Sequence, residues 1–391
     1  LREGSGAPEQ VRKRVVENMD GAYFPVKTII PSTEIVHDRV MLELFRGCIR
    51  GCRFCQAGYV YRPVRSRSPE LLARYGKAAC EDSGYQEMTL SSLSSTDYPC
   101  LLELCDDLLD YCAPRDIGLS LPSMRADTFS MNLMERLQRV RKGGLTFAPE
   151  AGTQRLRDAI NKNLREEDLL QSVRTAFTGG VKLYFMLGLP TETDEDVLGI
   201  ADLARKVYFA WRECSPNKAR GVRITVSTSW FVPKPNTAFQ WDAQIPVEEY
   251  QRRVDLLRDA LKRDKSITYN WHDPQTSYLE AIFSRGDRRL ADVLEWAWQH
   301  GAKFDSWSEY FDFQRWMDAL AACGLDGDFY AHRERPRDEV FPWSRIDPMV
   351  TPEFLWRERE LCYQSVTTPD CRTRCSGCGA NRLLSGGVCN G

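Results

Sequence analysis

Three cysteines close together in the chain could bind a metal cluster. Cys48, Cys52 and Cys55 follow a C-x3-C-x2-C spacing in a stretch rich in glycine and arginine, directly after the apolar run 40–45. A cubane iron–sulfur cluster has four irons, each usually bound by one thiolate. Three thiolates at this spacing could therefore leave one iron open to a small molecule. A zinc knuckle fits less well, because zinc takes four closed ligands, often from two C-x2-C pairs. Three unrelated packed thiols are the other alternative.

The stretch around these cysteines resembles the radical S-adenosylmethionine (SAM) superfamily. The resemblance implies that the three cysteines hold a 4Fe-4S cluster whose open iron binds SAM, and that SAM is cleaved reductively to a 5′-deoxyadenosyl radical. The protein then supplies orientation and shielding for chemistry that belongs to the cofactor. Nearly the whole chain further resembles an uncharacterised radical SAM family whose members usually carry a cobalamin-binding-type domain before the barrel. The resembling stretches are residues 45–65, 145–157, 184–196 and 302–309.

The cobalamin-type domain itself has no counterpart in this sequence. Its Asp-x-His-x-x-Gly string is absent, and none of the four histidines has that setting. The chain begins with Leu1 rather than Met, and its opening reads as a linker, so we expect a fragment of a longer protein. Cobalamin would then be bound only if missing N-terminal residues supply its site.

Bulk properties narrow the class of protein. The chain has 391 residues, a net charge of −2 and 14 cysteines. No apolar run approaches the ~20 residues of a membrane span, and no signal peptide is visible. Many cysteines without a secretion signal indicate metal binding in a reducing compartment rather than disulfides. We therefore expect a cytoplasmic protein.

Strand-like and helix-like segments alternate from about residue 36, which predicts βα units with a parallel sheet. The predicted fold is α/β, an open (β/α)6 partial TIM barrel of radical SAM type with a mostly helical C-terminal extension and a Cys-rich tail. The predicted strands are 39–46, 87–91, 116–121, 144–147, 181–187 and 223–229. The predicted helices are 69–83, 100–112, 128–141, 165–178, 193–210 and 248–263, with a short helix near 11–17. The predicted domains are 1–34 (linker), 35–270 (barrel), 271–363 (Trp-rich helical extension) and 364–391 (metal-binding tail).

Function in parallel βα barrels sits on the loops after the strands, and several residues there are candidates for binding SAM. The resemblance implies that Ser91 and Ser92 contact the SAM amino group, although a serine turn explains them equally well. Glu150 resembles the residue that accepts hydrogen bonds from the ribose hydroxyls. Ser123 and Arg125 could reach the cavity, where Arg125 could pair with the SAM carboxylate. The further candidates are Gly188 and Val232 beside the adenine, and Arg155 and Lys162, which surface charge also explains.

The loop after the first strand is rich in arginine and tyrosine. Its positive charge could bind the anionic end of SAM or a phosphate-bearing substrate. A solvated surface loop is an equal alternative for Arg62, Arg65 and Arg67.

A second group of cysteines lies near the C-terminus. Cys371, Cys375 and Cys378 repeat the C-x3-C-x2-C spacing, and Cys389 could be a fourth ligand. These thiols could hold a second 4Fe-4S cluster or a zinc ion. A flexible tail with incidental thiols is the alternative.

Two functions compete. The first is a radical SAM enzyme that methylates or methylthiolates RNA or a ribosomal component, with a flavodoxin or ferredoxin as electron donor. The second is a non-catalytic iron–sulfur electron carrier or assembly scaffold, which would not bind SAM. The sequence names no substrate.

Overall fold

The structure is a computed structural model, and it describes residues 6, 8–122, 125, 145–175, 180–215 and 221–385. Three predictions fall outside these residues, namely the helix at 128–141, the SAM contact of Ser123 and the metal ligand Cys389.

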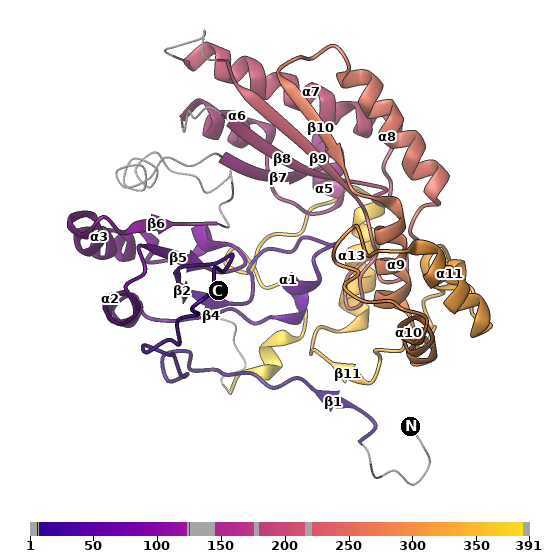
Figure 1. Cartoon of the computed structure of the whole chain (residues 1–391), viewed down its shortest axis with the longest axis horizontal. Coiled ribbons are helices and arrows are strands. Elements are labelled where there is room, and N and C mark those ends of the chain that lie inside the picture. Colours follow the sequence, from indigo (N-terminus) through magenta and orange to yellow (C-terminus); the bar gives the residue numbers. More distant parts are fainter. Residues whose placement is uncertain are drawn as a thin grey trace.

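Two sheets of parallel strands form the centre of the molecule (Figure 1). The first sheet has the order β2-β5-β6 and the second has the order β10-β9-β8-β7, with parallel pairing throughout. Within the described residues, no strand pairing joins β6 to β7. The strands are β2 (Val40–Glu43), β5 (Glu87–Ser91), β6 (Gly118–Ser120), β7 (Leu145–Glu150), β8 (Gly180–Leu187), β9 (Arg223–Trp230) and β10 (Ile267–Trp271).

Helices cover one face of each sheet, and each interface holds a hydrophobic core. Side chains alternate between buried and more accessible positions along β8 and β9, as expected when only one face packs under helices. The first sheet carries α2 (Pro69–Ser83) and α3 (Leu101–Cys112). The second sheet packs with α7 (Asp194–Cys214) and α8 (Val247–Leu261), and α6 (Glu166–Thr175) packs on α7. The short helix α5 (Gln154–Ala159) follows β7. The predicted α/β class with parallel strands is confirmed.

Two local predictions were wrong. A seventh parallel strand, β10, pairs with β9; its alternation of Ile267, Tyr269 and Trp271 with two polar residues is a strand signal that the six-strand prediction overlooked. Val11–Arg12 forms strand β1 rather than a helix, because it pairs with β11 (Ile346–Asp347). Pro69 begins α2 as expected.

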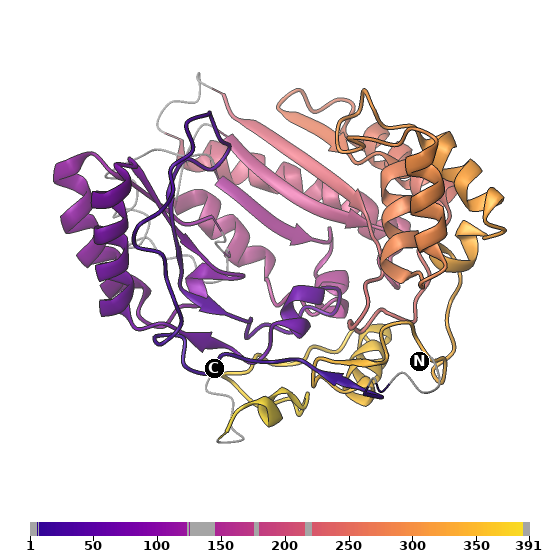
Figure 2. The ribbon, with the colours of Figure 1, turned by 60° about the horizontal axis from the view of Figure 1, so that its bottom comes forward.

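The C-terminal extension is mostly helical, as predicted, and it has its own apolar core. Its helices are α9 (Pro274–Arg285), α10 (Leu290–Gln299), α11 (Phe313–Ala322), α12 (Gly327–Ala331) and α13 (Pro352–Tyr363). Figure 2 shows α13 and the following chain running along the lower edge of the molecule, beside the N-terminal segment. In the described part of the chain, no helix is long and apolar enough to cross a membrane.

Short elements surround the first cysteines. β3 (Phe45–Arg46) pairs antiparallel with β4 (Arg65–Ser66). The two ends of the segment between these strands therefore lie side by side. Between them lie the cysteine loop, residues 47–55, and α1 (Gln56–Val60). The 3-10 turns are Ser95–Asp97, Ala113–Arg115 and Ala380–Leu383.

Candidate functional site

The cysteine loop begins with a close backbone contact. Gly47 has a φ of 90°, and a Cβ there would come within 2.8 Å of the carbonyl oxygens of Tyr61 and Pro63. Only glycine fits this conformation at such a distance. The loop ends at Cys55, whose thiol accepts a hydrogen bond from the Gly58 amide at 3.3 Å and caps α1.

A fully buried arginine fixes the middle of the loop. Arg53 donates to the carbonyl of Ala159 at 2.6 Å and to that of Val366 at 2.7 Å. Its Nε lies 3.2 Å from a carboxylate oxygen of Glu358 on α13. Asn161 adds a bond of 3.0 Å to the carbonyl of Gly51. The loop is thus held by α5, α13 and the segment after α13, all of them distant in sequence.

The charges of the three thiols act on one another in this loop. Burial, and then the charge of Cys52, raise the pKa of Cys48 to about 12. The pKa of Cys55 is raised by the same two causes, which outweigh the Gly58 hydrogen bond and the charge of Lys162. Because metals bind thiolates, a metal centre would displace these protons. The donor set fits an iron–sulfur cluster.

The arrangement of the thiols distinguishes a site for a single metal ion from a site for a cluster. Across the described residues, no three His, Cys, Asp or Glu side chains converge on a site for one metal ion. A cubane cluster binds each thiolate through a different iron, so its ligands need not meet at one point.

A carboxylate and a lysine lie next to the loop, at the end of β7. Glu150 has a φ of 69°, just beyond a shift of register between β7 and β8, and such backbone strain in a non-glycine residue is typical of functional sites. Lys162 Nζ lies 3.0 Å from Glu150 Oε1 and 5.9 Å from the ring centre of Phe54. Both charges act on Cys55. The side chain of Lys162 is 13% exposed, so the interpretation as a surface charge was wrong.

Arg125 lies on the same side of the loop as this pair. Its Nη2 donates to the carbonyl of Lys162 at 2.8 Å, and its charge lowers the pKa of Asp97. Glu150 and Lys162 thus lie beside the first cysteines, and Arg125 contacts the main chain at Lys162. In contrast, Arg155 is half exposed and bonds to Thr191 and Asp196, away from the loop.

Asp97 joins the loop to the end of the first sheet. Arg50 Nε donates to its carboxylate at 2.9 Å, and Ser94 donates at 2.6 Å. Burial alone would raise the pKa of Asp97, but the hydrogen bonds and charge of Arg50 outweigh burial and lower it. Nothing in the sequence around Asp97 marked it as a partner of Arg50, because the two are 47 residues apart.

The remaining candidates for SAM contacts fall into two groups. Ser91 and Ser92 both line a cavity at the end of β5, although Ser92 also accepts from the Ser94 amide in a serine turn. The other two do not fit the contacts expected of them. Gly188 lies against Ile245, whose side chain is 2.9 Å from a Cβ built there, and its amide donates to Glu192. Val232 is buried in the core of the helical extension rather than at a ligand cavity.

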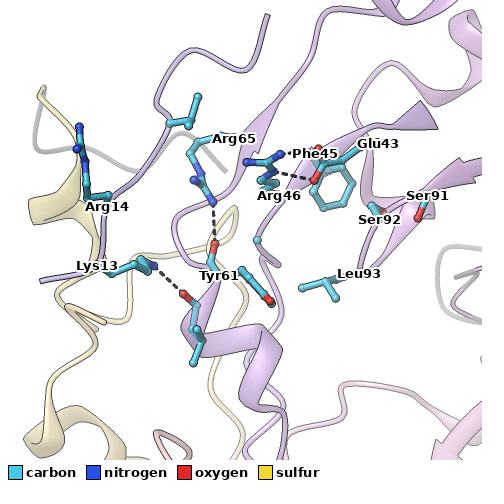
Figure 3. A pocket seen from close by; sticks show the side chains of 13 residues that line it. Lys13, Arg14, Glu43, Phe45, Arg46, Tyr61, Arg65, Ser91, Ser92 and Leu93 are labelled. Carbon is cyan, nitrogen blue, oxygen red and sulfur yellow. Dashed lines mark hydrogen bonds and ion pairs between the residues drawn. The ribbon is translucent and has the colours of Figure 1, made fainter. Parts of the chain in front are cut away.

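The cavity beside the cysteine loop has a volume of about 660 Å³ and is strongly basic. Figure 3 shows Lys13 and Arg65 each aimed at a main-chain carbonyl, Arg46 paired with Glu43, and Tyr61 between them. Arg14 also lines it. Burial and the charge of Arg65 lower the pKa of Lys13 to about 8. We call this space the basic cavity. The run Arg12-Lys13-Arg14 was the overlooked sequence signal for it.

Two arginines of the loop after α1 are buried, so the interpretation as a solvated surface loop was wrong for them. Arg67 is 3% exposed and donates to the carbonyls of Met19 and Ala22. Arg62 is also 3% exposed and donates to the carbonyls of Gly58 and Arg50. Only Arg65 reaches the basic cavity.

The C-terminal cysteines lie against the first cysteine loop. The Cys371 amide donates to the carbonyl of Ile49 at 3.1 Å, and Arg372 donates to the carbonyl of Asp97. Cys378 is buried and Cys375 is exposed. Cys362 is fully buried in an apolar cluster and is a packing residue.

A family model described as the radical SAM superfamily matches residues 42–204. Residues 42–204 therefore form a domain of the radical SAM superfamily, a class of enzymes, as the cysteine spacing predicted. The matched range contains the cysteine loop, Glu150 and Lys162.

Curated relatives extend the likeness beyond this domain. An uncharacterised protein of Methanocaldococcus jannaschii, MJ0966, is 33% identical over 264 residues, which is 66% of this chain and 54% of that protein. A tRNA-2-methylthio-N(6)-dimethylallyladenosine synthase of Pelotomaculum thermopropionicum is 28% identical, over 51% of this chain and 46% of that protein. The threonylcarbamoyladenosine tRNA methylthiotransferase MtaB of Bacillus subtilis is 21% identical, over 68% and 56%. The chain spans about half the length of these relatives.

Among solved structures, the radical SAM methyltransferase TsrM of Kitasatospora setae, with cobalamin and a 4Fe-4S cluster bound, is similar with a TM-score of 0.44 and 11% identity. The match covers 72% of this chain and 61% of TsrM. A likeness this weak carries no argument about function.

Proposed function

We propose that this chain is the catalytic part of a radical SAM enzyme that transfers a methyl or methylthio group to RNA. The observation that carries the proposal is the basic cavity beside the cysteine loop, which offers cations and an aromatic ring to a polyanion. The tRNA-modifying relatives support the same substrate class.

The residues around the loop have distinct roles in this proposal. A 4Fe-4S cluster, when bound, supplies the electron that cleaves SAM to methionine and a 5′-deoxyadenosyl radical. Cys48, Cys52 and Cys55 hold it. Glu150 accepts from the ribose hydroxyls, and Lys162 holds the Glu150 carboxylate in place. The polar groups of Ser91 and Ser92 contact the amino group.

The basic cavity binds the RNA in this proposal. Arg14, Lys13 and Arg65 contact phosphates, and Tyr61, which is 53% exposed, stacks on a base. A small reduced protein of the flavodoxin or ferredoxin class delivers the electron, and the cluster and free thiols belong in a reducing compartment such as the cytoplasm. Cobalamin participates only if residues outside this chain bind it.

The first test measures SAM cleavage. The chain is reconstituted anaerobically with iron and sulfide, reduced with dithionite and given SAM. We expect 5′-deoxyadenosine or S-adenosylhomocysteine, and the Cys48→Ala variant should form neither. If the reconstituted chain with a spectroscopically intact cluster forms neither product, the proposed activity is wrong.

The second test concerns RNA. We expect unfractionated tRNA to bind with an affinity that falls steeply with salt, because phosphate contacts release counterions. The variant Arg14→Gln/Arg65→Gln should bind about tenfold more weakly, whereas a matched variant of exposed cations elsewhere, Arg212→Gln/Lys262→Gln, should bind like the wild type. Equal binding by both variants would remove the basic cavity from the proposal and leave SAM cleavage unaffected.

A further inference from the structure

The segment after α13, residues 364–385, lies between the first cysteine loop and solvent, and we call it the tail. The Cys371 amide donates to the carbonyl of Ile49, the residue after Cys48, at 3.1 Å. The next four residues, 372–375, are all exposed. Figure 2 shows this part of the chain at the lower rim of the molecule. A protein that docks on the tail would therefore be separated from the first cysteine loop by a single layer of chain.

The tail presents positive charge to solvent. It contains three arginines, all of them exposed, and a single acidic residue, Asp370. The Asp370 carboxylate is already engaged, because it accepts from the amides of Arg372 and Thr373 and lies 3.7 Å from Arg50 of the first cysteine loop. The arginine side chains thus set the sign of the charge on the outer surface of the tail.

A fourth arginine joins this surface from α13. Arg357 is exposed, and its Nη2 donates to the carbonyl of Ser376 at 2.6 Å. Arg382 similarly donates to the carbonyl of Gly379 at 3.2 Å. Main-chain carbonyls orient these guanidinium groups but carry no net charge to neutralise them. We call the four side chains the tail arginines; they are Arg357, Arg372, Arg374 and Arg382.

The tail arginines form a different surface from the basic cavity. In the described part of the chain, the residues that line the basic cavity come from the N-terminal segment, β2, β3, the first cysteine loop, α1, β4 and the end of β5, and none comes from the tail. The tail also contains no aromatic residue on which a base could stack. Charge without a stacking platform favours a folded acidic protein over single-stranded RNA as its partner.

The proposed function, on which this inference rests, requires a partner of this kind. One electron passes from a reduced carrier protein to the oxidised cluster, so the carrier is oxidised by one electron, the cluster is reduced by one electron, and no bond breaks in this transfer. Electron transfer slows steeply with distance, so the carrier must dock close to the first cysteine loop. RNA occupies the basic cavity in that proposal, which leaves another face of the loop for the carrier.

We propose that the tail arginines are the docking surface for an acidic one-electron carrier protein of the flavodoxin or ferredoxin class. The guanidinium groups pair with carboxylates on the carrier, and this complementarity speeds and orients the encounter. Because the charges are exposed, the association weakens as the salt concentration rises.

Binding gives the first test. A purified acidic flavodoxin and a purified acidic ferredoxin are each added to the reconstituted chain, and the dissociation constant is measured by biolayer interferometry at low and high salt. We expect at least one of them to bind, and Arg374→Glu/Arg382→Glu should bind it at least about tenfold more weakly at low salt. The matched control Arg212→Glu/Arg263→Glu reverses two exposed arginines outside the tail and should bind like the wild type.

Two further variants check the reason for the loss. Arg374→Lys/Arg382→Lys keeps the charge and should keep most of the affinity, and Arg14→Gln/Arg65→Gln in the basic cavity should bind the carrier like the wild type. If neither carrier binds the wild type, or if the reversed tail variant binds as tightly as the wild type, the docking surface is wrong. If that variant loses affinity for tRNA and keeps its affinity for the carrier, the tail is an RNA surface and the proposal is also wrong.

SAM cleavage with two reductants separates the docking role from the proposed activity. With dithionite, Arg374→Glu/Arg382→Glu should cleave SAM as fast as the wild type and hold the same amount of iron, because a small reductant needs no docking surface. With the reduced carrier at a concentration below its dissociation constant, the same variant should be at least about tenfold slower. Equal rates with the carrier would overturn the proposal. If the wild type cleaves SAM with neither reductant, the proposed activity fails, and the binding measurement still decides the docking surface.

Discussion

Single residues around the first cysteines combine strain, burial and charge in a small volume. Glu150 holds a left-handed backbone conformation and an ion pair with Lys162, and both charges reach Cys55. Gly47 allows two carbonyl groups to approach the loop. Such features have an energetic cost and persist where function requires them.

Glu150 provides the sharpest test of the SAM site at this scale. Replacing Glu150 with Ala removes the acceptor for the ribose hydroxyls, and hydrogen bonds to a charged group contribute about 1.5–3 kcal/mol. We expect SAM to bind the reconstituted protein at least about tenfold more weakly, as measured by equilibrium dialysis. The exposed control Glu167→Ala should bind SAM like the wild type. Equal affinity for both variants would remove Glu150 from the SAM site.

The raised pKa of Glu192 predicts that the free energy of unfolding depends on pH. Burial raises its pKa from 4.5 to about 7, against the opposing effects of Arg253 and the Gly188 amide. The folded state therefore binds the Glu192 proton more tightly than the unfolded state does, and this contribution to the free energy of unfolding falls as pH rises from about 4.5 to 7.

Denaturant titrations over this pH range measure the effect. Glu192→Gln should flatten the dependence, and the exposed control Glu195→Gln should not. A dependence that is equally steep in all three proteins would show that Glu192 is ionised throughout, as its close contact with Arg253 would then dictate.

At the scale of elements, α13 serves as a brace for the cysteine loop. Arg53 and Glu358 form an ion pair with side chains at most 1% exposed, and Thr368 donates to the same carboxylate at 2.8 Å. The helix thereby joins the C-terminal extension to the first turn of the barrel.

Removing one partner of the Arg53–Glu358 ion pair should lower the free energy of unfolding. Removing one partner of a buried ion pair destabilises a protein by about 3–5 kcal/mol, because the other charge stays buried. We expect Glu358→Leu to lower the free energy of unfolding by this amount and to reduce iron retention after desalting. The double variant Arg53→Met/Glu358→Leu should recover part of the stability. A double variant that is as unstable as the sum of both single variants would show that the two charges are not coupled.

At the scale of the whole molecule, the barrel, the N-terminal segment and the tail meet at one place. Lys13 donates to the carbonyl of Val60, and the Cys371 amide donates to that of Ile49. The basic cavity and the tail, residues 364–385, therefore both adjoin the first cysteine loop. A change in the conformation of this loop should therefore change the amide exchange of the tail.

Hydrogen–deuterium exchange tests this coupling. Without the first cluster the loop loses its order, and the amide of Cys371 loses its acceptor. The variant Cys48→Ala/Cys52→Ala/Cys55→Ala should therefore exchange faster in peptides that cover residues 368–375. Peptides from β8 and β9 should be unchanged. Tail exchange equal to that of the reconstituted wild type would contradict the coupling.

The sequence by itself determined the chemistry and most of the local elements. The spacing of Cys48, Cys52 and Cys55 is a local feature of the sequence. The periodic placement of apolar residues in the strands β5, β8 and β9 and in the helices α2 and α8 is also local. Only the tertiary structure decided what lies beside these elements. The edge strand β10 has only a short alternation of apolar and polar residues, and its bonds to β9 show that it extends the sheet. Arg62 and Arg67 resemble surface arginines in the sequence, and long-range packing buries them. The contact of Cys371 with Ile49 and the pair of Arg53 with Glu358 join residues more than 300 positions apart, and no local pattern records a partner at that distance.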